Sequence, residues 1–191
     1  MKIVGITYYD GAENVVLKSD SSLLVNRKPL FVPEWFRELQ ALPCVVLRVS
    51  RLGKCIAPRF ASRYYDAMAA SVDFFSADKL REAKKAGKPW TEAVAFENSL
   101  AVGEMEEVGS KMLEVRWELR RGEETIEQIR WSQDEMQALL DQAVARVSEL
   151  LTIRQGDLIY VAMSTKPWQL QQDDILRCVN NEQEQLYCKI K

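Results

Sequence analysis

The chain contains no histidine. Without imidazole, a serine or cysteine nucleophile activated by histidine, a histidine-ligated zinc and a histidine pH switch are all excluded. The chain also has no CxxC pair, because its four cysteines are scattered as Cys44, Cys55, Cys178 and Cys188. Zinc and iron–sulfur sites need more closely grouped cysteines, so we expect four reduced thiols, most of them buried.

An excess of charge and a long apolar run are also missing. Lys+Arg number 26 and Asp+Glu number 28, which gives a formal net charge of −2. Phosphate contacts need a basic face, so we expect no nucleic-acid partner. No stretch approaches the roughly 18 consecutive apolar residues of a membrane span, and the segment MKIVGITYYD lacks the apolar region of a signal peptide. We therefore expect a cytoplasmic protein with no membrane partner.

The composition is that of an ordinary globular protein. Of the 191 residues, 47% are hydrophobic and 28% are charged. A domain of this size buries about 70% of the surface of its unfolded chain, so it needs neither disulfides nor a metal to fold. The sequence has no internal repeat and no low-complexity linker. We predict one domain spanning residues 1–191.

Runs of β-branched and aromatic residues predict strands along most of the chain. They cover Lys2–Thr7, Asn14–Lys18, one or two strands within Leu23–Val32, Cys44–Val49, Met68–Phe74, Lys111–Arg120, a return strand ending at Trp131, Leu158–Met163 and Gln185–Ile190. Pro43 marks the expected start of the fourth region. The longer apolar run Tyr64–Phe75 does not alternate, so periodicity leaves strand and helix open there, and we favour a strand.

Two helices are predicted from their capping residues. Ser76 is placed to cap a helix that ends before Gly87, with Pro89 just beyond. Ser132 and Glu135 form a capping box ahead of an apolar stripe spaced by three and four residues. With about eight to ten strands and two helices, the sequence predicts an α+β fold dominated by β-structure.

Three stretches, taken in register, resemble the fumarylacetoacetate hydrolase family. They are VLKSDSSLLVNRKPLFVP at Val16–Pro33, the segment Leu47–Phe96 with RLGK, VDF and AGKPW, and the helix after Ser132 that runs into LTIRQGDLIY. Members of this family cleave or isomerise β-diketo and acylpyruvate-type acids with a divalent metal. The resemblance implies a mixed β-roll or β-sandwich of the family's C-terminal domain type with a few helices, a homodimer, and a small keto acid as ligand.

The same resemblance places the family's metal ligands on this chain. The two glutamates of its Glu-x-Glu motif fall on Leu42 and Cys44, and its aspartate is retained as Asp73. Mg²⁺ and Mn²⁺ prefer carboxylate oxygens, and a single carboxylate leaves such an ion nearly all its water. We expect no cofactor, with Mg²⁺ or Mn²⁺ only if the chain is an enzyme after all. Asp73 could instead be a leftover carboxylate that reaches backbone or water.

The family's other functional positions are also changed. Its arginine and lysine fall on Ala77 and Val94, which removes both groups that would stabilise an enolate oxyanion. Side chains of Val161–Thr165 replace its glycine-rich loop, and its early histidine is missing. We therefore expect no catalytic residue. Tyr8 and Lys18 lie near the family's pocket and are candidates for binding an anionic substrate; alternatively, Tyr8 packs in the core and Lys18 is solvated.

Two functions follow from this comparison. The first is a fumarylacetoacetate-hydrolase-like protein that has lost metal-dependent catalysis and acts as a binding or partner subunit. The alternative is a metal-dependent hydrolase, isomerase or decarboxylase of acylpyruvate or 2-hydroxyhepta-2,4-diene-1,7-dioate-type keto acids, with a different site rebuilt from Asp73 and carboxylates such as Glu97 or Glu104. Either would form a homodimer, which the five Trp, six Tyr and six Phe also favour, because aromatics concentrate in permanent interfaces.

Overall fold

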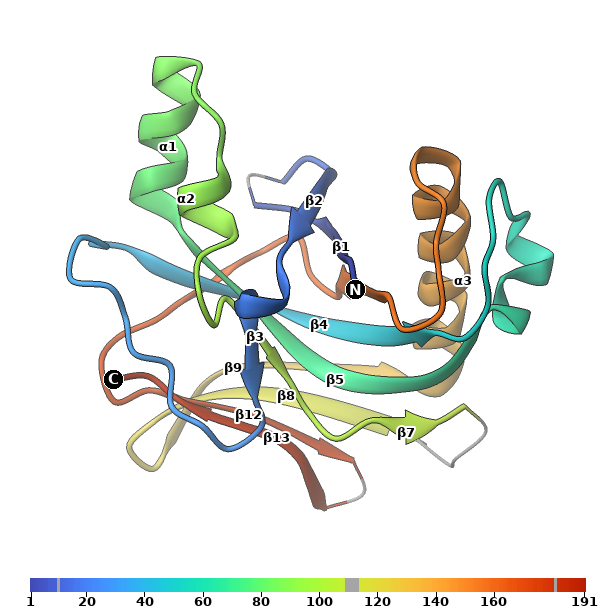
Figure 1. The fold of residues 1–191 in the computed structure, drawn as a ribbon. Coiled ribbons are helices and arrows are strands. Elements are labelled where there is room, and N and C mark those ends of the chain that lie inside the picture. Colours follow the sequence, from blue (N-terminus) through green and yellow to red (C-terminus); the bar gives the residue numbers. More distant parts are fainter. Residues whose placement is uncertain (10, 109–113, 181) are drawn as a thin grey trace.

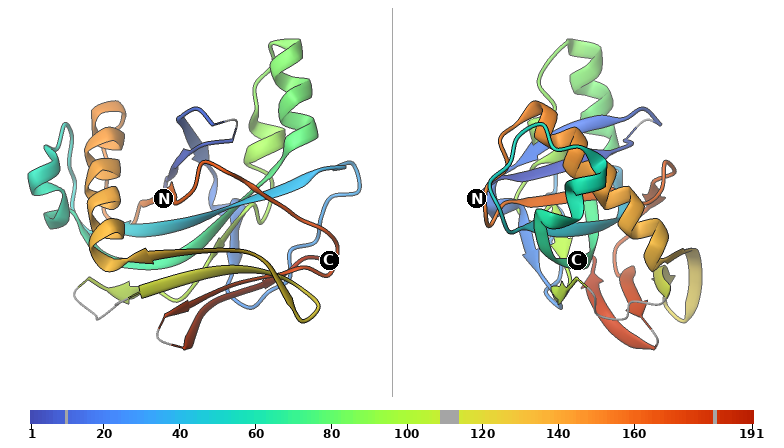
Figure 2. Two further views of the ribbon diagram at one scale, coloured as in Figure 1. Left: turned by 180° about the vertical axis from the view of Figure 1, so that it is seen from behind. Right: turned by 90° about the vertical axis from the view of Figure 1, so that its right-hand side faces the viewer.

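The computed structural model describes residues 1–9, 11–108, 114–180 and 182–191. Within them, thirteen strands form a larger and a smaller β-sheet, accompanied by three α-helices. The larger sheet is strongly curled (Figure 1). Helices α1 (Ala77–Ala86) and α2 (Thr91–Val94) cover apolar side chains on one of its faces, and helix α3 (Gln133–Leu150) packs with the smaller sheet against the other face. Figure 2 shows helices α1 and α3 at opposite ends of the larger sheet.

The larger sheet is mixed, with strand order β2-β1-β10-β4-β5-β6-β3. Its strands, with β11 paired to β4 and β7 to β5, are β1 (Ile3–Thr7), β2 (Asn14–Lys18), β3 (Leu23–Val25), β4 (Leu39–Val49), β5 (Tyr65–Ser76), β6 (Leu100–Val102), β7 (Glu106–Glu107), β10 (Leu158–Ala162) and β11 (Trp168–Gln169). Strands β1 and β10 run parallel, as do β3 and β6, and the other pairs are antiparallel. The edge strands β2 and β3 are joined only by residues 19–22, which include the 3₁₀ helix η1 (Asp20–Ser22), so the two edges of the sheet must approach each other.

The smaller sheet is antiparallel, in the order β13-β12-β8-β9. Its strands are β8 (Glu114–Arg121), β9 (Glu124–Ser132), β12 (Ile175–Asn180) and β13 (Gln183–Lys189). Val115, Trp117 and Leu119 alternate toward the larger sheet and are fully buried, which confirms the predicted hairpin. The first predicted residues of this strand, Lys111 to Leu113, lie outside the described residues.

Both predicted helices are confirmed with their caps. Helix α1 (Ala77–Ala86) begins after Ser76, whose hydroxyl accepts from Lys79 N, and ends at Gly87 with a φ of 62° that suits glycine. Helix α3 (Gln133–Leu150) begins with the Ser132–Glu135 capping box. Three helical elements were not predicted, the short helix α2 (Thr91–Val94) and the 3₁₀ helices η1 and η2 (Pro58–Arg63). Every helix in the described part of the chain is too short or too polar to traverse a lipid bilayer.

Two details of the predicted strands were wrong, the start of β4 and the number of strands. Strand β4 begins at Leu39 and runs through Pro43, where a start was expected. Pro43 O accepts from Met163 N at 2.8 Å, so the proline nitrogen faces the same side, where β10 ends and β11 follows. Its missing N–H therefore removes no bond to β5.

Of the one or two strands predicted within Leu23–Val32, the structure has one, β3. After Val25 the backbone leaves the larger sheet, and Leu30 N and Val32 N each donate at 2.9 Å to carbonyls of Lys189 and Lys191. The strand count is also higher than predicted. The additional strands are short, as in β6, β7 and β11, or carry no clear alternation, as in β12.

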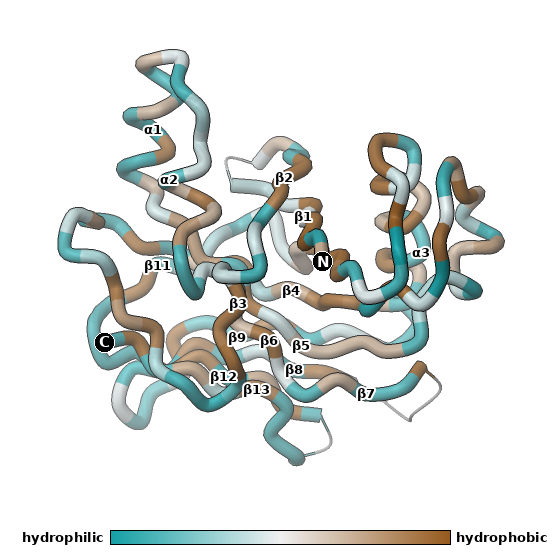
Figure 3. The backbone as a smooth tube through the Cα atoms, in the orientation of Figure 1, coloured by the Kyte–Doolittle hydropathy of each residue, from teal (hydrophilic) through white to brown (hydrophobic). Residues whose placement is uncertain are grey.

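Apolar side chains form two buried clusters, one on each side of the larger sheet. One lies between the two sheets and under α3, and includes Val45, Leu47, Trp117 and Val144. The other lies inside the curl, beneath α1 and α2, and includes Leu42 among its members. Hydrophilic residues gather in the loops around the structure (Figure 3). Both faces of the larger sheet are therefore covered by buried apolar side chains.

Trp117 ties the two sheets together, because its indole Nε1 donates to Ser71 O of β5 at 3.2 Å. We predict that Trp117→Phe lowers the free energy of unfolding by about 2 kcal/mol, through the lost hydrogen bond and a small cavity. The same change at Trp35, which is 66% exposed, should cost less than about 0.5 kcal/mol. Urea denaturation of both variants checks this, and equal losses would contradict it.

Candidate functional site

Asp73 and Lys18 meet inside the curl of the larger sheet. Asp73 lies on β5 and Lys18 is the last residue of β2, and their side chains are both 0% exposed. Lys18 Nζ is 2.7 Å from Asp73 Oδ1. The other carboxylate oxygen, Oδ2, accepts from the hydroxyl of Tyr9 at 2.9 Å. Both oxygens of Asp73 are thus occupied by protein groups.

The ammonium of Lys18 has three oxygen partners for its three N–H groups. Besides Asp73, it donates to Ser99 Oγ at 2.9 Å and to Ser99 O at 3.1 Å. Its nitrogen also lies 5.8 Å from the ring centroid of Tyr160, close enough for a cation–π contact. An ammonium has three donors and no acceptor, so the two hydrogen bonds to Ser99 and the ion pair with Asp73 suit the protonated form. The expectation that Lys18 is solvated was wrong.

Burial is the dominant electrostatic effect here. Burial lowers the pKa of Lys18 and raises the pKa of Asp73, and the attraction between the two groups opposes both shifts. Burial, together with the Asp73 charge, raises the pKa of Tyr9 well above its usual value, so this phenol is a neutral donor. The fold can therefore bury either charged group, Lys18 or Asp73, only while the oppositely charged partner is present.

The positions expected for metal ligands converge on this pair. In the β4–β5 register Leu42 lies opposite Asp73, and Cys44 lies opposite Ser71. Directly opposed residues point to the same face of a sheet, so residues 42, 44 and 73 share one site. Leu42 and Cys44 are fully buried, and burial raises the pKa of the Cys44 thiol. The site therefore holds one carboxylate, one alkyl group and one neutral thiol.

These residues do not fit Mg²⁺ or Mn²⁺. Such ions require about six oxygen ligands, whereas Asp73 is already engaged by an ammonium. Within residues 1–9, 11–108, 114–180 and 182–191, no three Cys, Asp or Glu side chains gather to hold a metal. The candidates for a rebuilt site, Glu97 and Glu104, are both exposed.

Of the two tyrosines after β1, the second is the one that joins the cluster. Tyr9 contacts Asp73, whereas Tyr8 makes none of the polar contacts described above. Tyr8 is partly buried and lines a separate hollow of about 200 Å³ against α3, near Glu13 and Arg146. Its predicted role in substrate binding stays a prediction.

Gly5 permits the close packing of Tyr160 over β1. The two residues are register partners in the parallel β1–β10 pair. A Cβ at position 5 would come within 2.0 Å of the tyrosine ring, which no side chain tolerates. The sequence analysis did not identify Tyr9, Ser99 or Tyr160. The one available signal was Gly5, because a lone glycine inside an apolar strand indicates that another group packs closely against the backbone.

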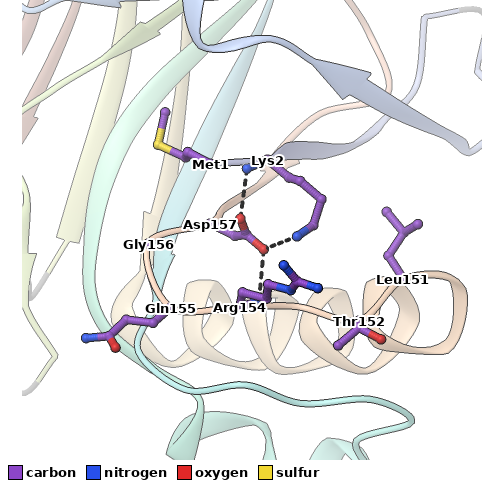
Figure 4. A pocket seen from close by; sticks show the side chains of 8 residues that line it. All are labelled: Met1, Lys2, Leu151, Thr152, Arg154, Gln155, Gly156 and Asp157. Atoms are coloured by element: carbon purple, nitrogen blue, oxygen red, sulfur yellow. Dashed lines mark hydrogen bonds and ion pairs between the residues drawn. The ribbon is translucent and has the colours of Figure 1, made fainter.

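A further hollow, of about 570 Å³, lies where the turn after α3 meets the first strand (Figure 4). Asp157 closes its base, accepting from Lys2 N and Arg154 N at 2.8 Å each and pairing with Lys2 Nζ at 2.6 Å. Burial acts to raise the pKa of Asp157, but the bonds from Lys2 and Arg154 outweigh it and lower the pKa. This carboxylate fastens β1 to the turn before β10, so its role in the GDLIY segment is structural.

Solved structures of known proteins have this same fold. Fumarylpyruvate hydrolase from Pseudomonas aeruginosa, in complex with Mn²⁺ and pyruvate, matches with a TM-score of 0.82 and 14% identity over 100% of this chain and 89% of its own. A protein from Yersinia pestis CO92 assigned to the fumarylacetoacetate hydrolase family matches at 0.81 and 18%, covering 100% and 92%. The 5-carboxymethyl-2-hydroxymuconate delta-isomerase from Mycobacterium smegmatis matches at 0.77 and 13%, covering 99% and 78%.

No protein-family model and no curated protein sequence matches the chain. The structural likeness confirms the resemblance inferred from the sequence at the level of the fold, which is α+β and built as in fumarylacetoacetate hydrolase family proteins. At these identities the likeness extends to the fold alone.

The Lys18–Asp73 pair predicts that a second substitution restores part of the stability that a first substitution removes. Lys18→Met leaves the Asp73 carboxylate buried without a counter-charge and should lower the free energy of unfolding by about 3–5 kcal/mol. Adding Asp73→Asn to this variant removes the stranded charge, so the double variant should be more stable than Lys18→Met alone. Chemical denaturation of the single and double variants measures the coupling.

Lys28→Met, at an exposed lysine, is the matched control and should change stability by less than about 0.5 kcal/mol. A double variant less stable than Lys18→Met would show that the two charges do not compensate each other.

The lowered pKa of Asp157 predicts a pH dependence of stability. Its folded pKa lies below the unfolded value of about 3.9, so its contribution is present above that pH and is lost as pH falls through the folded pKa. Asp157→Asn should therefore cost about 1–2 kcal/mol at neutral pH and progressively less below about pH 4. Thermal unfolding across pH 2.5–7, with Asp20→Asn at an exposed position as control, measures the difference; a pH-independent loss would contradict it.

Proposed function

We propose that this chain is a fumarylacetoacetate-hydrolase-like protein that has lost metal-dependent catalysis and acts as a binding or partner subunit. The observation that carries the proposal is the buried Lys18–Asp73 pair, with Nζ and Oδ1 2.7 Å apart. Asp73 is the only carboxylate at the three positions where the family resemblance expects metal ligands. An ion could use the Asp73 Oδ1 atom only by displacing a buried ammonium that also donates two hydrogen bonds to Ser99.

The remaining positions support the same conclusion. Ala77 and Val94, which stand where the resemblance expects an arginine and a lysine, are 6% and 3% exposed and belong to the apolar cluster inside the curl. Neither can stabilise developing negative charge on a substrate oxygen. The site therefore lacks both the ligands and the cationic groups that the family's chemistry requires.

A homodimer and a cytoplasmic location are parts of the same proposal. Most large aromatic side chains are at least partly buried, and Trp117, Tyr160 and Phe74 are fully buried. Among the described residues, Phe31, Trp35 and Phe60 are exposed, at 73%, 66% and 38%, and the first two belong to the segment between β3 and β4. Exposed aromatics of this size are typical of protein interfaces. The four cysteines are free, as suits a reducing compartment.

The second candidate function is a metal-dependent hydrolase or isomerase of small keto acids. It is favoured by the similar structures, which include a fumarylpyruvate hydrolase and a 5-carboxymethyl-2-hydroxymuconate delta-isomerase. A small keto acid would then be the ligand, and Mg²⁺ or Mn²⁺ the cofactor. This candidate requires a metal site built on Asp73 despite its pairing with Lys18.

Metal binding separates the two functions. We predict that 5 mM Mg²⁺ or Mn²⁺ leaves the melting temperature unchanged, because an ion that binds the native state would raise it by mass action. Turnover of an acylpyruvate, followed by loss of its enol absorbance, should equal the uncatalysed rate with either metal. Mn²⁺-dependent turnover that disappears in Asp73→Ala would overturn the proposal and establish the second function.

Light scattering tests the assembly. The predicted mass at micromolar concentration is twice the 22.0 kDa of the chain. Trp35→Ser should shift the equilibrium toward monomer if the exposed aromatic segment is the interface. A mass that stays at the monomer value as concentration rises would remove the homodimer from the proposal.

A further inference from the structure

A stretch of the chain without acidic residues lies at the α3 end of the molecule. No aspartate or glutamate occurs between Glu38 and Asp66, and the segment Arg51–Arg63 contains four basic residues. This segment, which includes the 3₁₀ helix η2, packs against the end of α3, where Cys55 N donates to Ser148 O at 2.9 Å. Figure 1 shows it in teal beside the orange helix.

Exposed basic and apolar side chains gather where this segment meets the turn after α3. Gly53 and Ile153 exchange backbone hydrogen bonds at 3.0 and 2.9 Å, which places Leu52 opposite Arg154. The apolar side chains Leu52, Leu150 and Phe60 are 70%, 46% and 38% exposed. Together with five exposed basic residues they form what we call the basic surface, which consists of Arg51, Leu52, Lys54, Arg59, Phe60, Arg63, Leu150 and Arg154.

The positive charges of the basic surface are not neutralised by neighbouring carboxylates. Asp66 and Glu149 adjoin the segment, but in the part of the chain that the structure describes they pair with Arg48 and Arg146 instead. The formal net charge of the whole chain is −2, so the rest of the molecule is net negative while this end is strongly positive. A molecule with such an asymmetry turns its positive end toward an anionic surface.

Phe60 contacts two of these cations. The guanidinium carbons of Arg59 and Arg63 lie 4.8 and 4.9 Å from the centroid of its ring. A guanidinium is weakly hydrated and stacks on aromatic rings, so the ring and both charges can leave bulk water together. Exposed apolar side chains surrounded by Lys and Arg are typical of proteins that bind at the surface of a membrane.

We propose that the basic surface binds the anionic headgroups of a phospholipid membrane, with Leu52 and Phe60 reaching the boundary of the acyl chains. A protein in the cytoplasm, the location proposed above, faces a membrane leaflet that carries anionic lipid. The sequence analysis expects no membrane partner from the lack of a long apolar run, and binding at the membrane surface requires no such run. The inference goes beyond the proposed function, which concerns the interior of the curl.

Cosedimentation with lipid vesicles tests the proposal. The chain should bind vesicles of about 70% phosphatidylcholine and 30% phosphatidylserine at low salt, bind pure phosphatidylcholine at least about tenfold more weakly, and be released by about 0.5 M NaCl. The double variant Arg59→Gln, Arg63→Gln should bind the anionic vesicles about 25-fold more weakly, since each basic residue near such a surface contributes about fivefold.

The matched control removes the same charge from the opposite end of the larger sheet. Lys85 and Lys88 are exposed at and just beyond the end of α1. The double variant Lys85→Gln, Lys88→Gln should bind anionic vesicles within about twofold of the unaltered chain, because charges more than a Debye length from the membrane are screened.

Cys55 provides an independent measurement. It is exposed and lies within the segment Arg51–Arg63, whereas the other three free cysteines are buried. An acrylodan label on Cys55 should shift its emission to the blue on anionic vesicles, because the dye leaves water. The same label placed by Lys85→Cys in a Cys55→Ser background should show no shift.

If the Arg59→Gln, Arg63→Gln variant does not fold, as judged by circular dichroism, Arg51→Gln with Arg154→Gln replaces it and should give the same loss. No binding to anionic vesicles, equal binding to both kinds of vesicle, or an equal loss in the control at α1 would overturn the inference. Binding of poly-L-glutamate without binding of vesicles would assign the surface to an acidic protein partner and would also overturn it. Mn²⁺-dependent turnover would instead overturn the proposed function and leave this inference intact.

Discussion

Two opposite charges buried side by side form the constraint on which the interior of this protein depends. Lys18 and Asp73 are both 0% exposed, and a buried ion pair is tolerable only when its remaining donors and acceptors are satisfied. Ser99 and Tyr9 supply those partners from the segments next to β6 and β1. Elements far apart in the sequence are thereby held in one arrangement, because losing any contributor would leave a buried polar group unpaired.

Much of the fold could be predicted from local pattern. The β1–β2 and β8–β9 hairpins, helix α1 and the capped helix α3 agree with the sequence analysis because turn residues, alternation and capping boxes act over a few residues. The continuation of β4 through Pro43 could not be predicted in this way. It depends on where β10 ends, and that is set by pairing between residues more than a hundred positions apart.

The candidate site was predictable in part. Asp73, Leu42 and Cys44 were placed by resemblance, and their convergence follows from the β4–β5 register. The burial of Lys18 was not foreseen, because a lysine at the end of an exposed-edge strand is ordinarily solvated and its partner lies on another strand. Tyr9 rather than Tyr8 contacts Asp73 because the two side chains face opposite sides of the backbone. Two identical neighbouring residues give no local sequence signal of which one faces the interior.

The pairing of strands also determines the order in which this interior can form. Tyr160, which lies over Gly5 and faces the ammonium, belongs to β10, and β10 pairs with β1 about 155 residues earlier in the chain. Likewise, Asn26 holds Tyr187 across 161 positions. Contacts of such long range slow folding, because the entropy of closing the loop is lost before the contacts form. During synthesis on the ribosome, the native enclosure of Lys18 and Asp73 therefore cannot be complete before β10, which supplies Tyr160, has emerged.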